Sequence, residues 1–341
     1  MKFFRVLLLW LAISVSPAQA AFINGQSYVA LSGWARANGF HFSFANRNDV
    51  ILSNGNARLV FDVDSAEAQI NGVNVRLSFP VAKGALISQF DLDKTIRPLL
   101  SSGRYLQPQK ITTICLDPGH GGKDTGNRVG FGFFAHNEKT YTLALAFELR
   151  DQLRKAGFNV VLTRSKDVYV DLPARPAIAN RVGADLFISL HFNATPTSKN
   201  EVQGTETYCI TPVGASSSNS QGEGADHAAT AANRVEQKSL LLAYQMQKSL
   251  VQNLHANDRD VRRARFAVLR DAQMPAILIE GGYMTHPAES KKIYDSAYRK
   301  QMASAIVKGI LAYQKLSAPP TIQPVPGKKP AVKSAPKKKS P

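Results

Sequence analysis

From about residue 111, short apolar runs alternate with segments of helical spacing, and this alternation limits the possible folds more than any other feature. The strand-like runs are 111–117, 158–163, 186–191, 204–210, 265–269 and 276–280. Apolar residues at helical spacing predict helices from Asn137 to Gly157, over 174–182 and 240–254, and from Pro287 through Leu311. Strands that alternate with helices predict an α/β layer fold.

The segment from residue 21 to about 110 has a different pattern. Short alternating runs, such as 57–63 and 68–70, are separated by Asn54-Gly55 and Asn71-Gly72 turns, and one short helix is expected over 31–38. These features predict a small β-rich α+β domain. With its alternation over 71–77 and the following Phe79-Pro80-Val81, the segment resembles the small N-terminal domain of copper amine oxidases. That domain recurs as an accessory unit on secreted bacterial proteins, so a positioning or binding role is implied.

The two ends of the chain differ from its middle. Lys2 and Arg5 precede an apolar run and then Ala18-Gln19-Ala20, the pattern of a secretory signal peptide over residues 1–20. A membrane anchor is the alternative, but the run is short for a span. The Lys- and Pro-rich residues 317–341 predict a disordered basic tail. The expected segments are therefore the signal peptide, the domain over 21–110, a second domain over 111–316, and the tail.

Charge and cysteine content narrow the partners and the kinds of site. The formal net charge of +17 would suit nucleic acid, an anionic membrane face or an acidic polymer outside the cell. Export to the periplasm, cell wall or extracellular space argues against nucleic acid. Cys115 and Cys209 lie in predicted strands without a C-x-x-C pair, so a cysteine metal site is not supported. A disulfide and two buried free thiols both stay open.

Four residues capable of metal binding or proton transfer lie at the ends of predicted elements. His120 follows the first strand in a Gly-rich turn, Glu138 opens the first helix, and His191 and Glu280 end later strands. Because the carboxyl ends of parallel strands line the crevice of an open sheet, these side chains can converge. Two imidazoles and a carboxylate, with a position left for water, suit a hydrolytic zinc site, and a further carboxylate can transfer the proton of the water. We expect Glu280 to have that second role.

Purely structural roles are the alternatives to metal binding and proton transfer for these residues. Glu138 could cap its helix, and Glu280 could pair with Arg265 or Arg270. His136 and His286 rank below the chosen histidines as ligands.

The same residues lie in a series of motifs. Over about residues 114–316 the chain resembles the zinc-dependent N-acetylmuramoyl-L-alanine amidases of bacterial cell walls, with matching motifs, in order, at 116–122, 137–139, 189–194, 265–270 and 277–284. The resemblance implies a mixed, mainly parallel sheet flanked by helices. It also implies one Zn²⁺ held by His120, Glu138 and His191, with Glu280 as the catalytic carboxylate. The implied reaction cuts the amide between muramic acid and L-alanine in peptidoglycan, for wall remodelling or daughter-cell separation. A zinc peptidase acting on stem peptides and a non-catalytic wall-binding protein are the alternatives.

A polar insert spans residues 211–236. A surface loop and a lid or regulatory segment are both open. Some cell-division members of the resembled family carry a helix here that blocks the zinc until an activator removes it. This insert has no convincing amphipathic stripe and could instead be a substrate-side loop. Regulation by the insert, with an activator protein acting through it, is a hypothesis: deletion of residues 216–233 should then raise activity on purified wall.

Overall fold

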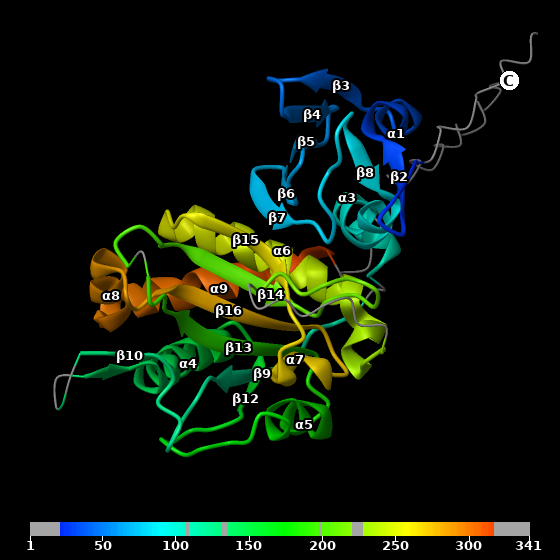
Figure 1. Ribbon diagram of the computed structural model, residues 1–341. Coiled ribbons are helices and arrows are strands. Elements are labelled where there is room, and N and C mark those ends of the chain that lie inside the picture. Colours follow the sequence, from blue (N-terminus) through cyan, green and yellow to red (C-terminus); the bar gives the residue numbers. More distant parts are fainter. Residues whose placement is uncertain are drawn as a thin grey trace, which may run out of the picture.

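The computed structural model describes residues 21–106, 109–130, 132, 135–197, 199–219 and 228–316. Within them, one sheet runs through the molecule in the order β12-β9-β13-β16-β14-β15-β7-β6-β5-β4-β3 (Figure 1). Its first six strands are β12 (Asn159–Leu162), β9 (Thr113–Pro118), β13 (Leu186–Asn193), β16 (Ala276–Tyr283), β14 (Thr205–Cys209) and β15 (Asp258–Arg263). Strands β12, β9, β13 and β16 are parallel, and β14 is antiparallel to β16. The predicted α/β fold with a mixed, mainly parallel sheet is confirmed.

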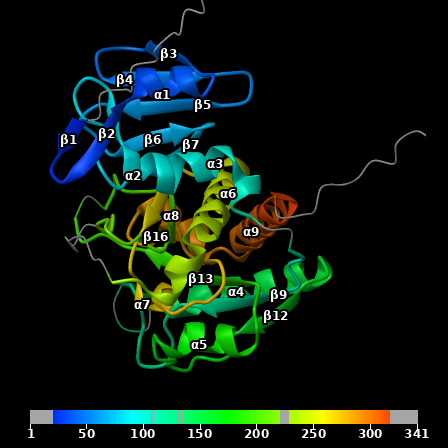
Figure 2. The same cartoon turned by 90° about the vertical axis from the view of Figure 1, so that its right-hand side faces the viewer.

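Helices cover both faces of these six strands (Figure 2). Apolar residues of α4 (Glu138–Lys155), α6 (Glu236–Leu254) and α9 (Ser296–Leu316) pack with Leu116, Leu190 and Ile279 on one face. Those of α5 (Ala174–Arg181) and α7 (Ala267–Arg270) pack with Cys115 and Phe187 on the other. Successive strand residues point to opposite faces, so β9 and β13 contribute to both cores.

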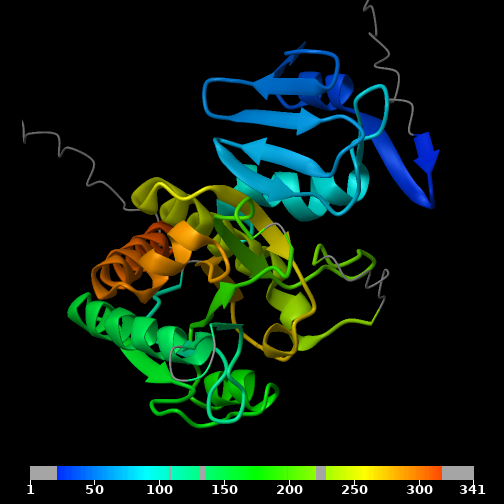
Figure 3. The same cartoon turned by 60° about the vertical axis from the view of Figure 1, so that its left-hand side comes forward.

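The N-terminal part of the chain extends the same sheet (Figure 3). Its antiparallel strands are β3 (His41–Phe44), β4 (Asp49–Ser53), β5 (Arg58–Asp62), β6 (Glu67–Ile70) and β7 (Val73–Arg76). A smaller sheet holds β1 (Ala21–Ile23), β2 (Gln26–Ala30) and β8 (Leu86–Ser88), beside α1 (Leu31–Ala37) and the helical segments α2 (Gln89–Asp91), η1 (Leu92–Ile96), α3 (Arg97–Leu100) and η2 (Ser102–Arg104). Strand β7 pairs with β15 at Val75 and Val261. The domain boundary near residue 110 stays a prediction, and the sheet is continuous across it.

Two predicted elements were wrong. The run 265–269 was expected to be a strand, but its end forms α7, and the strand of this region is the charged β15. A short apolar run carries no clear period, so it fits a buried helical turn as well as a strand. Charged side chains are tolerated in β15 because they have partners: Arg259 donates a hydrogen bond to Glu206 at 2.8 Å.

The C-terminal helix is also divided. The segment from Pro287 through Leu311 was predicted as one helix, but α8 (Pro287–Tyr294) and α9 are separated by Asp295, which has extended backbone angles. The Asp295 carboxylate accepts hydrogen bonds from the N–H groups of Ala297 and Tyr298 at 3.2 Å. It therefore caps the start of α9, which favours a break over a continuous helix.

The structure resolves the cysteine question. Cys115 and Cys209 are both buried and free. In the sheet, β13 and β16 lie between their strands, which corresponds to a separation on the order of 14 Å, too far for a disulfide. Burial, with the charge of Asp117, raises the pKa of Cys115 to about 12, so its thiol is not a nucleophile at neutral pH.

The two predicted end segments, the signal peptide (1–20) and the tail (317–341), lie outside the described residues. Across the part of the chain that is described, none of the helices has the length and apolar character needed to cross a bilayer.

Candidate metal centre

His120 lies just beyond the carboxyl end of β9. Its backbone has a φ of 62°, in the left-handed region that residues other than glycine rarely adopt. Its Nδ1 lies 2.9 Å from a carboxylate oxygen of Asp124, and its Nε2 lies 3.1 Å from Oε2 of Glu138. A carboxylate on one ring nitrogen orients the imidazole and leaves the other nitrogen for a metal. Asp124 was missed in the sequence, although it lies only four residues after His120.

Glu138 is the first residue of α4, which follows a short hairpin of β10 (Arg128–Val129) and β11 (His136–Asn137). Its side chain is 1% exposed. Oε1 accepts the N–H of Phe192 at 3.0 Å, and Oε2 accepts the N–H of Asn127 at 2.8 Å. Burial acts to raise the pKa of Glu138, but the hydrogen bonds and charges of His120 and His191 outweigh burial and hold the pKa well below its usual range. Glu138 is therefore a buried, ionised carboxylate.

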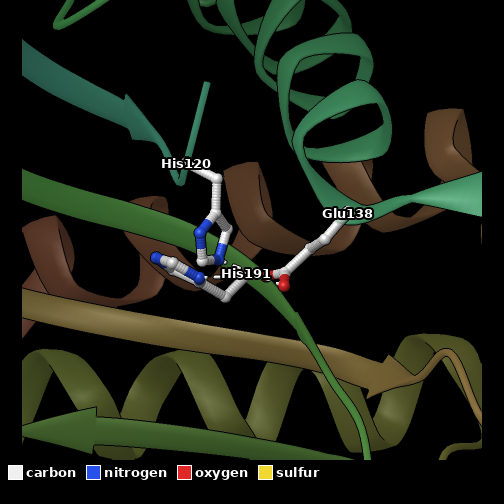
Figure 4. A group of neighbouring side chains, drawn as sticks. All are labelled: His120, Glu138 and His191. Atoms are coloured by element: carbon white, nitrogen blue, oxygen red, sulfur yellow. Dashed lines mark hydrogen bonds and ion pairs between the residues drawn. The ribbon is translucent and has the colours of Figure 1, made fainter. Parts of the chain in front are cut away.

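His191 lies near the end of β13 and brings the third side chain to the site. Its Nδ1 lies 3.0 Å from Oε1 of Glu138. One ligand atom from each of His120, Glu138 and His191 lies within 4.8 Å of the others, and Figure 4 shows the side chains converging. The convergence expected from the strand ends is present. Two imidazoles and one carboxylate, all donors that zinc favours, fit a single metal ion.

Glycines leave the space that the side chains of His120, Glu138 and His191 occupy. A Cβ on Gly119 would lie 2.3 Å from the ring of His191. A Cβ on Gly126, whose φ is 63°, would lie 2.6 Å from both Oε2 of Glu138 and Cδ2 of His120. The Gly-rich turn was singled out in the sequence, but Gly126 was not, because nothing local shows that it faces Glu138.

Replacement of Gly119 by Ala is therefore expected to push the His191 ring out of place. We expect at least a roughly 10²-fold loss of the hydrolysis that the resemblance implies, since a displacement of about 1 Å at a reacting centre can have that effect. Zinc content and turnover of purified protein test this. Gly55→Ala is the control, because a Cβ at Gly55 meets nothing within 4 Å. Unchanged zinc content and rate in Gly119→Ala would contradict this geometry.

Glu280 lies on β16 opposite His191 in the register of the two strands. A cavity of about 440 Å³ is lined by His120, Glu138, His191 and Glu280, with apolar walls that include Leu172 and Phe266. Oε2 of Glu280 is buried and has no hydrogen-bond partner among the described residues. Burial, together with the charges of Glu138 and Glu206, raises the pKa of Glu280 well above its usual value. A carboxyl group in such surroundings is suited to proton transfer.

The histidines ranked lower lie elsewhere. His136 stacks on Tyr294 and contacts the Tyr141 hydroxyl. Nδ1 of His286 accepts the N–H of Glu289 at the start of α8. Within the described ranges, His120, Glu138 and His191 form the one group with metal-binding spacing.

Comparisons with known proteins show what the chain is similar to. A family model described as N-acetylmuramoyl-L-alanine amidase matches residues 114–312, more than half of the chain. The N-acetylmuramoyl-L-alanine amidase AmiA of Escherichia coli is 33% identical over 224 residues, covering 59% of this chain and 75% of AmiA. The N-acetylmuramoyl-L-alanine amidase AmiC of Neisseria meningitidis is 33% identical over 252 residues, covering 65% of this chain and 59% of AmiC. The crystal structure of N-acetylmuramoyl-L-alanine amidase from Clostridium difficile 630 is similar at a TM-score of 0.50 and 33% identity, covering 61% of this chain and 98% of that one. His120, Glu138, His191 and Glu280 all lie within the matched residues.

Proposed function

Because this chain belongs to the family of N-acetylmuramoyl-L-alanine amidases, we propose that it cuts its peptidoglycan substrate with a zinc ion held by His120, Glu138 and His191. The convergence of these three side chains at a cavity that Glu280 also lines carries the proposal. The bond hydrolysed joins N-acetylmuramic acid to the first L-alanine of the stem peptide.

The residues divide the chemistry between them. His120, Glu138 and His191 would hold the zinc ion, which would supply a Lewis acid for the scissile carbonyl and lower the pKa of a water molecule. Asp124 fixes the ring of His120, and the N–H groups of Phe192 and Asn127 fix the carboxylate of Glu138, which the two histidines keep ionised. Glu280 takes a proton from the attacking water and gives it to the nitrogen of L-alanine, as the C–O bond forms and the C–N bond breaks. Since the pKa of Glu280 is raised by burial, its carboxyl group holds that proton more firmly than an exposed glutamate would.

Mass spectrometry of products from purified peptidoglycan tests the reaction. The proposal predicts intact stem peptides with a free L-alanine amino group, released from uncut glycan. Dialysis against a chelator should stop the release, and added zinc should restore it. A peptidase would yield only shortened stem peptides, and that outcome would refute the amidase assignment for this chain. No product from the zinc-loaded protein would favour the wall-binding alternative.

We also propose that the protein acts after export, in the periplasm or cell wall, in wall remodelling or daughter-cell separation. The predicted signal peptide supports export. For the segment over 21–110, we propose a separate domain with a positioning or binding role, as its resemblance implies.

The insert over 211–236 is proposed to restrain activity until an activator protein relieves it. Its described ends are well anchored: Ser218 hydrogen-bonds Arg263, and Asn233 donates to the carbonyl of Thr211. Its last residues form η4 (Ala231–Val235) and the start of α6. None of its described residues lines the cavity, and residues 220–227 lie outside the description.

Replacing residues 220–227 by a Gly/Ser segment of equal length sharpens the deletion test, because it leaves these anchors in place. We expect faster hydrolysis of purified wall in the absence of any partner. The same substitution in a Glu280→Gln background controls for activity from contaminants. An equal or lower rate would refute restraint by this part of the insert.

A further inference from the structure

Two arginines are buried directly behind the loop that carries His120. The exposed fraction is 3% for Arg164 and 1% for Arg175. Buried guanidinium groups destabilise a fold unless acceptors satisfy their N–H groups. Arg175 has a buried carboxylate partner, because its Nη1 lies 2.8 Å from Oδ1 of Asp117. Arg164 makes its hydrogen bonds mainly with backbone carbonyls, and two of these, on Gly119 and Lys139, directly adjoin proposed ligands.

A single nitrogen of Arg164 joins two segments that supply ligands. Nη2 donates to the carbonyls of Gly119 and Lys139, each at 2.9 Å. Gly119 directly precedes His120, and Lys139 directly follows Glu138. The loop after β9 and the first turn of α4 are thus connected beside two of the three ligands.

Other contacts fix the same loop. Nε of Arg164 donates to the carbonyl of Pro118 at 2.9 Å, and Nη2 of Arg175 donates to the carbonyl of His120 at 3.0 Å. The Thr142 hydroxyl donates to the carbonyl of Gly119 at 2.8 Å. The carbonyls of three consecutive residues, 118–120, therefore all accept hydrogen bonds. These bonds hold His120 in its left-handed conformation.

We propose that Arg164 is a positioning residue that sets the separation of His120 and Glu138 and thereby the affinity of the site for zinc. The role rests on the proposed metal centre. It requires the planar fork of arginine, which reaches Pro118 with Nε and both ligand segments with Nη2. A lysine would keep the charge, but its single nitrogen cannot reproduce this fork.

Arg164→Lys tests the role through zinc affinity, measured by competition with a chromophoric chelator. We expect a loss of about 10–100-fold, the usual effect of removing a partner that orients metal ligands. Arg263→Lys is the matched control. Arg263 is 4% exposed, but Nη2 donates to the carbonyl of Lys94 and the hydroxyl of Thr95, outside the metal site. Its replacement should leave zinc affinity unchanged.

Thermal unfolding of the metal-free variants separates positioning from stability. A merely structural role predicts lower midpoints for both variants, with zinc affinity preserved in the folded protein. If Arg164→Lys does not fold, Thr142→Val removes one of the same loop contacts at nearly constant volume, and it should weaken zinc binding in the same direction. Unchanged affinity in the folded variant would refute the role of this contact network.

The outcomes distinguish the positioning role of Arg164 from the proposed metal centre on which that role rests. If the unaltered protein binds no zinc, the metal centre fails, and the role of Arg164 fails with it. If the unaltered protein binds zinc and Arg164→Lys binds it equally tightly, only the positioning role fails. The absorption spectrum of the Co²⁺-substituted variant should also change, since it reports ligand geometry.

Discussion

Replacement of Glu280 by Gln is expected to lower turnover on peptidoglycan by about 10²–10⁴-fold, the usual effect of losing a group that transfers protons in the transition state. Gln keeps the shape of the side chain but cannot exchange a proton with water and the leaving amine. Zinc content should stay unchanged, because Glu280 is outside the ligand group of His120, Glu138 and His191. Initial rates of amine release and the zinc content per chain provide the measurement.

Glu148→Gln is the control for this variant. Glu148 lies on α4, away from the cavity, and accepts a hydrogen bond from Gln152. It should keep the rate of the unaltered protein. If Glu280→Gln retained turnover, the assignment of the proton-transferring residue would be wrong. If it lost zinc together with turnover, Glu280 would instead have a role in holding the metal.

Replacement of Glu138 by Gln is expected to abolish zinc binding and, with it, measurable hydrolysis. The variant loses the only anionic ligand of the proposed set. The amide also cannot accept two backbone hydrogen bonds, so its NH₂ would face the N–H of either Asn127 or Phe192. A buried donor left unpaired in this way costs about 1–3 kcal/mol of folding stability. Metal analysis and thermal unfolding would show both effects.

Glu236→Gln provides the matched control. Glu236 is also a buried glutamate that opens a helix, α6, but it accepts a hydrogen bond from Lys94 instead of facing histidines. This variant should retain zinc. A Glu138→Gln protein that kept one zinc per chain with full activity would rule out Glu138 as a ligand.

The sequence best predicted those site residues that lie at or near the carboxyl ends of strands. His191 and Glu280 lie opposite each other near the carboxyl ends of neighbouring parallel strands, although β13 and β16 continue to Asn193 and Tyr283. His120 follows β9, on the other side of β13, so the α/β pattern predicted that the three side chains could meet. The residues that support them were not predictable in this way. Asn127 contributes a backbone N–H, and Arg164 and Arg175 bind backbone carbonyls, so their partners carry no side-chain signature.

The fold shows a similar division. Long helices with regular apolar spacing, such as α4 and α6, were predicted near their observed positions. Strand β15 was missed because its charged residues resemble a loop until their partners are known. The pairing of β7 with β15 joins residues far apart in the chain, and no local pattern reports such a contact.

Anomalous scattering at the zinc edge, measured on crystals grown with zinc, would locate the metal. We expect a peak about 2.0–2.2 Å from a ring nitrogen of His120, a ring nitrogen of His191 and a carboxylate oxygen of Glu138. The cavity lined by Glu280 should lie beside the peak. The absence of a peak between these side chains, or zinc bound only elsewhere, would contradict the proposed zinc site.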